Sequence, residues 1–257
     1  MTSVPKTLIA MKCCLILLAG LLAPTIATVC AGAQSPANPV VIGQAVRLQS
    51  RTLKESRTLL ISTPDGYEQS EDRYPVLYLL DGETHFQYAS GIVRFLAQNG
   101  QIPKMILVGI VSGDMAHRTR DLTPPSSNEI DNRFSPGNGG ADAFLSFVAG
   151  ELIPFVDKTY RTRPYRLLAG HSFGGLFAIH TLITRPDLFK GYIAADPSLH
   201  WNNEAVISKA ESFLSDTKSL QSDLYLSASS DSGKVPSAVA RLHSALGRRV
   251  PAEFRWS

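Results

Sequence analysis

From residue 40 onward, short apolar runs alternate with segments of helical periodicity. Residues 75–80 and 104–111 are unbroken apolar runs of strand length, as expected for strands that are buried on both faces of a sheet. Strands that alternate with helices predict an α/β fold, with a mostly parallel central sheet and helices on both faces. The other expected strands are residues 40–48, 58–63, 165–169, 191–195, 223–227 and 252–256, and the first two form an antiparallel hairpin.

Helical periodicity fills most of the segments between these strands. The expected helices are residues 84–99, 141–159, 172–184, 204–214 and 237–246. Residues 112–140 are rich in Pro, Gly, Ser, Asp and Asn, so they are predicted to form one long loop. Long loops often act as lids or binding loops, which makes this segment a candidate wall of a functional site.

The first 33 residues differ in composition from the rest and are predicted to be a secretory signal peptide. They contain no acidic residue, and Lys6 and Lys12 precede an uninterrupted apolar run. The small residues at 31–33 (Ala-Gly-Ala) form a cleavage site, so Gln34 is expected to be the first mature residue.

A membrane anchor is the alternative interpretation of this leader. Its apolar run, residues 13–23, is too short to cross about 30 Å of hydrocarbon, and Pro24 interrupts the continuation. The sequence therefore predicts a secreted or periplasmic domain over residues 34–257, with no stable membrane insertion after cleavage.

Composition narrows the class of the mature domain. All three cysteines, Cys13, Cys14 and Cys30, lie in the leader, so disulfides do not stabilise the mature chain. The leader also holds two of the 25 basic residues, which leaves 23 against 22 acidic residues and a net charge of +1. Without a basic cluster, a nucleic-acid partner is not expected. Metal, phosphate-loop and dinucleotide motifs are also missing, so no cofactor is predicted.

The strongest chemical signal is the segment Gly170-His171-Ser172-Phe173-Gly174. A predicted strand precedes it and a predicted helix follows it, which is the context of a nucleophile elbow. Such a turn lifts the serine hydroxyl above the sheet edge, next to the positive end of the helix. The segment therefore predicts Ser172 as a nucleophile, and the alternative is an ordinary glycine-rich turn.

A serine nucleophile that attacks a carbonyl needs an oxyanion hole, usually two backbone N–H groups. The residue after the nucleophile, Phe173, provides the first. The predicted strand that ends at Leu80 runs into Asp81-Gly82, and the backbone of Gly82 is the candidate for the second. A plain Asp-Gly turn is the alternative at this position.

Four motifs resemble the putative-esterase family of α/β-hydrolases, which includes siderophore esterases, feruloyl esterases and S-formylglutathione hydrolases. The motifs are Leu77-Tyr-Leu-Leu-Asp-Gly82, Arg120-Asp-Leu-Thr-Pro124, Gly170-His-Ser-Phe-Gly-Gly175 and Pro197-Ser-Leu-His-Trp201. The resemblance implies an α/β-hydrolase fold and a serine–histidine pair, with or without a carboxylate, that acts on small carboxylic esters. The chain departs from the family pattern at residues 196–200, so the pocket beside Trp201 is expected to be more polar.

Candidates for the remaining roles are less specific. Asp231 lies after the strand at residues 223–227, where this fold places its acid, and Asp196 is the second candidate. Arg120 and Trp201 are the predicted substrate-binding residues. The alternative for Arg120, and for its neighbours Arg118 and Asp121, is a set of salt bridges within the loop.

The histidines offer no good general base. His171 and His180 flank the nucleophile helix and are expected to be structural, while His85 and His200 could touch a substrate. His243 lies inside a predicted helix. The base of this fold follows the final strand, so the sequence predicts that residues 34–257 lack the final loop, its histidine and the closing helix, and that this chain alone is inactive.

Three functions fit these motifs. The first is a secreted serine hydrolase that cleaves carboxylic esters through an acyl-enzyme on Ser172. The second is acyl transfer to an alcohol by the same residues. The third is a catalytically silent binding protein on the same fold, because a fold does not fix an activity.

Overall fold

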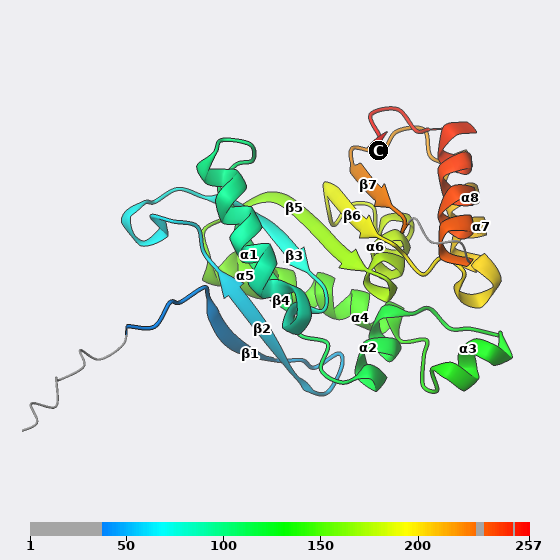
Figure 1. Ribbon diagram of the computed structural model, residues 1–257, viewed down its shortest axis with the longest axis horizontal. Helices are drawn as coiled ribbons and strands as arrows, with labels where there is room; N and C mark the ends of the chain where they lie inside the picture. Colours follow the sequence, from blue (N-terminus) through cyan, green and yellow to red (C-terminus); the bar gives the residue numbers. More distant parts are fainter. Residues whose placement is uncertain (1–37, 230–233, 249) are drawn as a thin grey trace, which may run out of the picture. The chain divides into compact units, whose positions relative to one another are not determined.

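The computed structural model of the chain describes residues 38–229, 234–248 and 250–257 (Figure 1). In its folded unit, Val41–Ser257, the strands are β1 Gln44–Gln49, β2 Ser56–Ser62, β3 Tyr74–Leu79, β4 Ile106–Ile110, β5 Thr162–His171, β6 Gly191–Ala195, β7 Asp223–Ser227 and β8 Arg255–Trp256. They form one eight-stranded sheet in the order β1-β2-β4-β3-β5-β6-β7-β8. β2 pairs antiparallel with β1 and β4, and all the other neighbours are parallel. The predicted hairpin and the mostly parallel sheet are confirmed.

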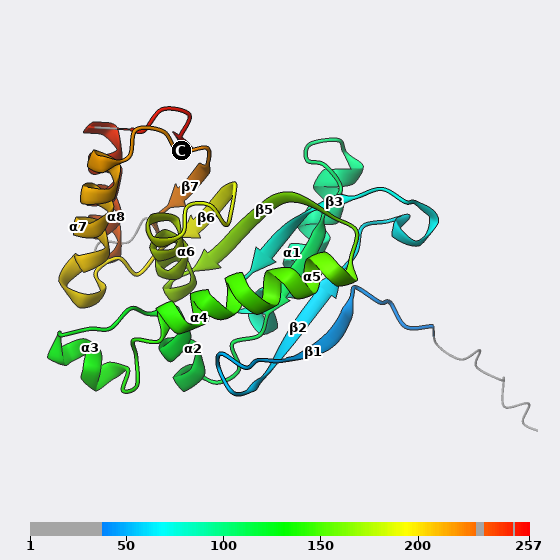
Figure 2. The same cartoon turned by 180° about the vertical axis from the view of Figure 1, so that it is seen from behind.

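Helices cover both faces of the sheet, as predicted. α1 (Gly82–Gln98) lies on the face seen in Figure 1. The opposite face, seen in Figure 2, carries α4 (Ala141–Phe147), α5 (Ile153–Thr159) and α6 (Phe173–Thr184). Each face has its own cluster of buried apolar side chains, a small one beneath α1 and a large one beneath the other helices.

The remaining helical segments lie at the ends of this arrangement. η2 (Val148–Leu152) is a turn of π-helix that joins α4 to α5, so the predicted helix over residues 141–159 is continuous. α7 (Trp201–Asp216) and α8 (Lys234–Arg248) pack against each other, and α7 also contacts α6. Within the described ranges, no helix is both long enough and apolar enough to cross a membrane.

The prediction of one long loop over residues 112–140 is wrong. Two short helices, α2 (Met115–Leu122) and α3 (Glu129–Phe134), interrupt it. The side chain of Asp114 accepts a hydrogen bond from the backbone N–H of His117 at 2.8 Å, and Asn128 accepts one from Ile130 at 2.8 Å. The Asp and Asn that gave the segment its loop-like composition therefore cap the N-termini of two helices.

Backbone conformation also sets two boundaries near the C-terminal part of the sheet. The strand expected over residues 252–256 is reduced to β8, because Glu253 adopts a φ of +65° and turns the chain. In α7 a left-handed turn at residues 202–204 separates Trp201 from the regular helix, which follows Glu204 and so starts next to the predicted position.

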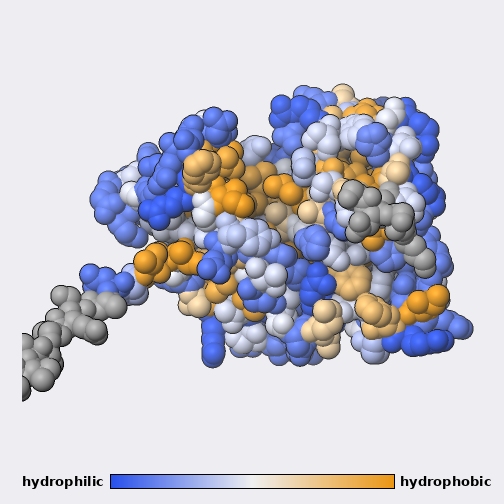
Figure 3. Space-filling model, viewed as in Figure 1, coloured by the Kyte–Doolittle hydropathy of each residue, from blue (hydrophilic) through white to orange (hydrophobic). Residues whose placement is uncertain are grey.

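The face of the sheet that carries α1 also exposes apolar side chains. Ala169, Ile193 and Tyr225 lie in register across β5, β6 and β7, and Tyr225 is 53% exposed. Figure 3 shows apolar side chains gathered on this face, between α1 and the strands β5 and β6. Whether a helix beyond Ser257 packs there stays a prediction.

A buried histidine on α6 makes the stability of the fold depend on pH. His180 is 4% exposed, and its Nε2 lies 2.8 Å from Oδ1 of Asp142 on α4. Burial lowers the pKa of His180, and the positive charge of Lys209 acts in the same direction, while Asp142 opposes them. The folded protein therefore favours the neutral imidazole.

We expect the free energy of unfolding to fall as the pH drops below the ordinary histidine value of 6.5, because the unfolded chain binds a proton that folded His180 resists. Urea unfolding at a series of pH values measures this slope. The variant His180→Gln is expected to have a shallower slope, and His243→Gln, on an exposed position of α8, is the control. Equal slopes for His180→Gln and the unchanged protein would contradict the assignment.

Candidate active site

Ser172 occupies a strained turn between β5 and α6. Its backbone has φ +58° and ψ −114°, a conformation that a non-glycine residue adopts only where its surroundings enforce it. Two glycines allow the turn. A Cβ on Gly170 would lie 2.8 Å from the Cα of Gly174 and closer still to its carbonyl group, and a Cβ on Gly175 would lie 2.9 Å from the Cα of Pro197. The predicted strand–turn–helix context of Ser172 is confirmed, and its role as a nucleophile stays a prediction.

The hydroxyl of Ser172 contacts a second serine. Its Oγ lies 3.1 Å from Oγ of Ser198, and the backbone N–H of Ser198 donates to the carbonyl oxygen of Ser172 at 3.1 Å. Ser198 is 5% exposed and follows β6, the strand next to β5 in the sheet. Ser198 lies within the motif at residues 197–201, but no local pattern in the sequence predicts a role for it.

The two predicted oxyanion-hole residues begin two helices at the same edge of the sheet. Gly82 is the first residue of α1, which follows β3, and Phe173 is the first residue of α6, which follows β5. β3 and β5 are parallel neighbours. The first N–H groups of a helix have no partner within the helix and carry its positive dipole end. Two sets of N–H donors therefore meet beside Ser172.

Close packing brings these two helix starts together. A Cβ on Gly82 would lie 2.8 Å from the carbonyl carbon of Gly109 on β4, so the turn after β3 has no room for a side chain there. A Cβ on Gly174 would lie 3.4 Å from the Cβ of Leu80 and 3.5 Å from Oδ2 of Asp81. The first turn of α6 thus lies directly against the end of β3.

The charged residues of α2 form ion pairs within the protein. Arg118 donates to both carboxylate oxygens of Asp81, from Nε at 2.8 Å and from Nη2 at 2.9 Å. Arg120 donates to Glu55 at 2.6 Å and to Asp121 at 2.8 Å. Only the pair of Arg120 with Asp121 is a salt bridge within the loop, which is the alternative that the sequence left open, because Asp81 and Glu55 lie outside residues 112–140. The side chain of Arg120 is 35% exposed, so a ligand could reach it. A substrate contact by Arg120 stays a prediction.

Trp201 lies beneath the elbow. It is 2% exposed, and its Nε1 donates to the carbonyl oxygen of Pro124 at 2.8 Å. Its ring meets the ring of Phe173 edge-on, with the centroids 5.3 Å apart. The structure therefore places Trp201 as a support for Phe173, and the predicted contact of Trp201 with substrate is not tested by it.

Of the two candidates for the catalytic acid, the structure describes only Asp196. The preferred candidate, Asp231, lies outside the described residues. Asp196 follows β6 with a φ of +46°, and its Oδ1 accepts a hydrogen bond from the backbone N–H of Ser229 at 2.8 Å. The carboxylate of Asp196 thereby holds the end of the β7 strand.

Two histidines line the edge beside the elbow. The rings of His85 and His171 meet edge-on, with centroids 6.0 Å apart. Burial lowers the pKa of His85, which favours its neutral form. His243, by contrast, packs against Trp256 with the ring centroids 4.7 Å apart. The ring of His243, on α8, therefore lies against β8.

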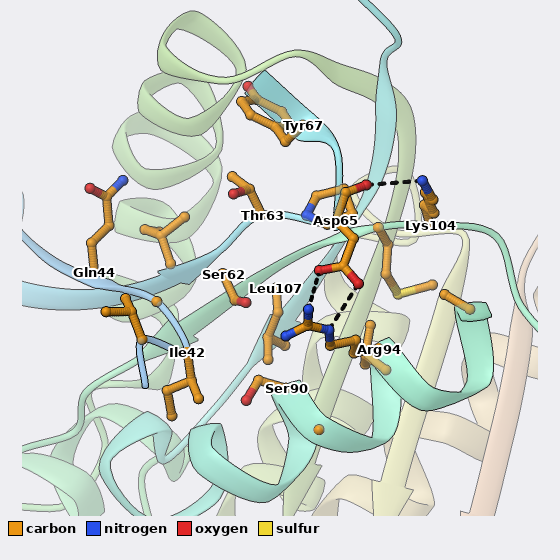
Figure 4. A pocket seen from close by; sticks show the side chains of 18 of the residues that line it. Ile42, Gln44, Ser62, Thr63, Asp65, Tyr67, Ser90, Arg94, Lys104 and Leu107 are labelled. Carbon is orange, nitrogen blue, oxygen red and sulfur yellow. Dashed lines mark hydrogen bonds and ion pairs between the residues drawn. The ribbon is translucent and has the colours of Figure 1, made fainter. Parts of the chain in front are cut away.

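One cavity lies away from the elbow. It has a volume of about 620 Å³ and opens between α1 and the hairpin, where Asp65, Arg94 and Lys104 lie at its rim (Figure 4). Lys104 and Thr63 flank the N-terminal end of β4, so this cavity lies at the sheet edge opposite to Ser172. Within the described part of the chain, no three His, Cys, Asp or Glu side chains are grouped to hold a metal ion.

The parallel sheet, with a positive-φ serine at a strand–turn–helix elbow, defines an α/β-hydrolase fold. Comparison with known families agrees with this class. The chain belongs to the family described as "Putative esterase", whose model matches residues 50–254.

Individual relatives are siderophore esterases by name. The chain is 35% identical over 191 residues to the Ferri-bacillibactin esterase BesA of Bacillus subtilis, across 68% of this chain and 65% of that protein. It is 36% identical over 156 residues to the siderophore enterobactin esterase of Emericella nidulans, across 54% of this chain and 51% of that protein. The IroE-like serine hydrolase from Shewanella oneidensis has a similar structure, with a TM-score of 0.73 and 35% identity over 84% of this chain and 72% of that one. The chain thus spans between half and two thirds of the length of these curated relatives.

Proposed function

We propose that the protein is a carboxylic-ester hydrolase that works through an acyl-enzyme on Ser172. The observation that carries this proposal is the strained backbone of Ser172, with φ +58° between the starts of two helices. Backbone strain of about 1–3 kcal/mol persists only where the surrounding structure enforces it, and such strain clusters at active sites.

The proposed reaction has two steps. In the first, Oγ of Ser172 bonds to the ester carbonyl carbon, the bond from that carbon to the alcohol oxygen breaks, and the alcohol leaves with the proton that the serine hydroxyl has lost. In the second, water attacks the acyl-enzyme and releases the acid. In each step the carbonyl oxygen becomes negative, and the N–H groups of Phe173 and Gly82 are the proposed donors to it. Ser198 holds the hydroxyl of Ser172 at 3.1 Å and so restricts its rotation before the attack.

The proposed substrates are siderophore esters. This class comes from the relatives, whose names specify ferri-bacillibactin and enterobactin as esters that they cleave. Arg120 contributes to substrate binding in this proposal by exchanging its bond with Glu55 for one with the ligand.

The test uses the complete protein that contains this chain, with a fluorophosphonate probe and three esters: enterobactin, p-nitrophenyl butyrate and a feruloyl ester. We expect the probe to label Ser172, as mapped by mass spectrometry, and enterobactin to be hydrolysed with the highest kcat/KM. Labelling without preference for enterobactin would refute the substrate class, and a lack of both labelling and hydrolysis would refute the hydrolase.

We also propose that the protein is exported and loses residues 1–33. The acid-free leader and the small residues at 31–33 support this proposal. N-terminal sequencing of the protein from the extracytoplasmic fraction is expected to begin at Gln34. Recovery of the intact leader on cytoplasmic protein would contradict it, and replacement of Ala31 and Ala33 by bulky residues is expected to block cleavage.

A further inference from the structure

A buried carboxylate lies directly behind the proposed oxyanion hole. Asp81 is 4% exposed and holds a left-handed backbone with φ +52°, one residue before Gly82. Its side chain does not cap α1, although Asp81 is the N-cap residue of that helix. The carboxylate instead accepts a hydrogen bond from the hydroxyl of Ser112 at 2.8 Å and lies against the first turn of α6, beside Gly174.

One side chain connects this carboxylate to both sides of Ser172. The guanidinium of Arg118 forms the two-pronged contact with Asp81. Its Nη2 also donates to the carbonyl oxygen of His171 at 3.4 Å, and its Cζ lies 5.4 Å from the ring centroid of Phe173. Arg118 therefore contacts the residue before one proposed oxyanion donor and the residues on either side of the nucleophile.

This arrangement has an electrostatic consequence. A negative charge on Asp81 without a partner would oppose the negative charge that develops on the substrate oxygen nearby. The guanidinium neutralises that charge, and its planar fork fixes the carboxylate in direction as well as in distance. With only 18% of its side chain exposed, Arg118 is held between α2 and the elbow.

We propose that Arg118 is a positioning residue that, through Asp81, holds the turn after β3 and the nucleophile elbow at the separation that the oxyanion hole requires. This inference rests on the proposed esterase function of Ser172. It differs from the sequence-based alternative for this arginine, which was a salt bridge within the loop at residues 112–140. A residue that binds substrate alters KM, whereas a residue that positions the oxyanion donors alters kcat.

The experiment compares Arg118→Gln, Arg118→Lys and the double variant Asp81→Asn/Arg118→Gln. Arg94→Gln is the matched control, because Arg94 makes the same two-pronged contact with exposed Asp65 at the far edge of the sheet. Three readouts are taken: the rate of fluorophosphonate labelling, kcat and KM for p-nitrophenyl butyrate, and hydrogen exchange in the peptides that contain Gly82 and Phe173.

We expect Arg118→Gln to lower kcat and the labelling rate by about 10- to 100-fold and to change KM less than about twofold. This loss in kcat is smaller than the loss expected when one oxyanion donor is removed, because the donors are displaced and not absent. Arg118→Lys keeps the charge without the fork and is expected to recover part of kcat. The double variant is expected to have a higher kcat and a higher labelling rate than Arg118→Gln, because it no longer buries an unpaired charge. Arg94→Gln is expected to match the unchanged protein.

Other results overturn the proposal. A rise in KM with unchanged kcat and unchanged hydrogen exchange would make Arg118 a substrate contact. If the double variant had the same kcat as Arg118→Gln, the charge of Asp81 would not be the cause of the loss, and the electrostatic part of the proposal would be refuted. If the unchanged protein neither reacts with the probe nor hydrolyses esters, the proposed function fails, and hydrogen exchange still decides the positioning role. Faster exchange in both peptides supports it, and unchanged exchange refutes it. If Arg118→Gln does not fold, Arg118→Lys and Asp81→Asn provide the same comparison.

Discussion

In the complete protein, replacement of Ser172 by alanine is expected to abolish fluorophosphonate labelling and to lower ester hydrolysis by more than about 10,000-fold, because loss of a serine nucleophile removes the acyl-enzyme route. The fold is expected to remain intact. The hydroxyl of Ser172 makes its hydrogen bond with Ser198, and one such bond contributes only about 1 kcal/mol to stability. Hydrolysis rates and thermal unfolding of the two proteins measure both effects.

The control for this variant is Ser212→Ala on α7. Ser212 is exposed, and its hydroxyl donates only to the carbonyl oxygen of Ser208 at 3.2 Å within its own helix. This variant is expected to keep full labelling and hydrolysis. If Ser172→Ala retained most of the activity, another group would be the nucleophile, and the strained backbone at Ser172 would need a different explanation.

The sheet could be predicted from the sequence because its strands are defined by local pattern. The bounds of β6 and β7 agree with the prediction to the residue, since both are continuous apolar or alternating runs between clear turn residues. Parallel strands buried on both faces leave little ambiguity, because their apolar runs are too short for helices. The elbow was predictable for a similar reason, since the glycine spacing, the strand and the helix are all local.

The helices within residues 112–140 could not be predicted by periodicity. α3 has six residues and no buried side chain, so it has no apolar stripe. The only local indication of these two helices was the pair of N-cap residues. Asp114 and Asn128 each precede a short helix, and the same residue types are also typical of loops. Composition alone therefore favoured the wrong alternative.

The partners of the site residues depend on tertiary contacts that no local pattern encodes. Arg118 and Asp81 are 37 residues apart in the sequence and Ser172 and Ser198 are 26 apart, yet each pair meets at one edge of the sheet. The topology makes this possible, because parallel strands bring their C-terminal ends to one edge. Which arginine of α2 would point to the elbow depends on the rotation of that helix, and the sequence-based prediction chose Arg120, whereas Arg118 is the one that contacts Asp81.

The elbow also depends on a glycine, Gly170, at which a side chain does not fit without a shift of the backbone. At Gly170 the chain of β5 passes so close to the backbone of α6 that a Cβ would lie within 2.8 Å of the Cα of Gly174 and nearer still to its carbonyl group. The obstacle is backbone rather than the end of a flexible side chain. The only relief is a shift of α6 away from β5, which would open the large apolar cluster that includes Leu176 and Leu168.

We therefore expect Gly170→Ala to lower the free energy of unfolding by about 3 kcal/mol, the upper part of the range for overpacked sites, and the melting temperature by about 6–12 °C. Activity is expected to fall as well, because a displaced α6 moves the N–H of Phe173. Gly91→Ala is the matched control. Gly91 lies within α1 with open space around its Cα, so alanine there is expected to stabilise the helix by about 0.5–1 kcal/mol. Urea unfolding and fluorophosphonate labelling of both variants test the argument. Equal stability of Gly170→Ala and Gly91→Ala would show that β5 and α6 can separate at no loss, and the strain assigned to Ser172 would then not be enforced by this contact.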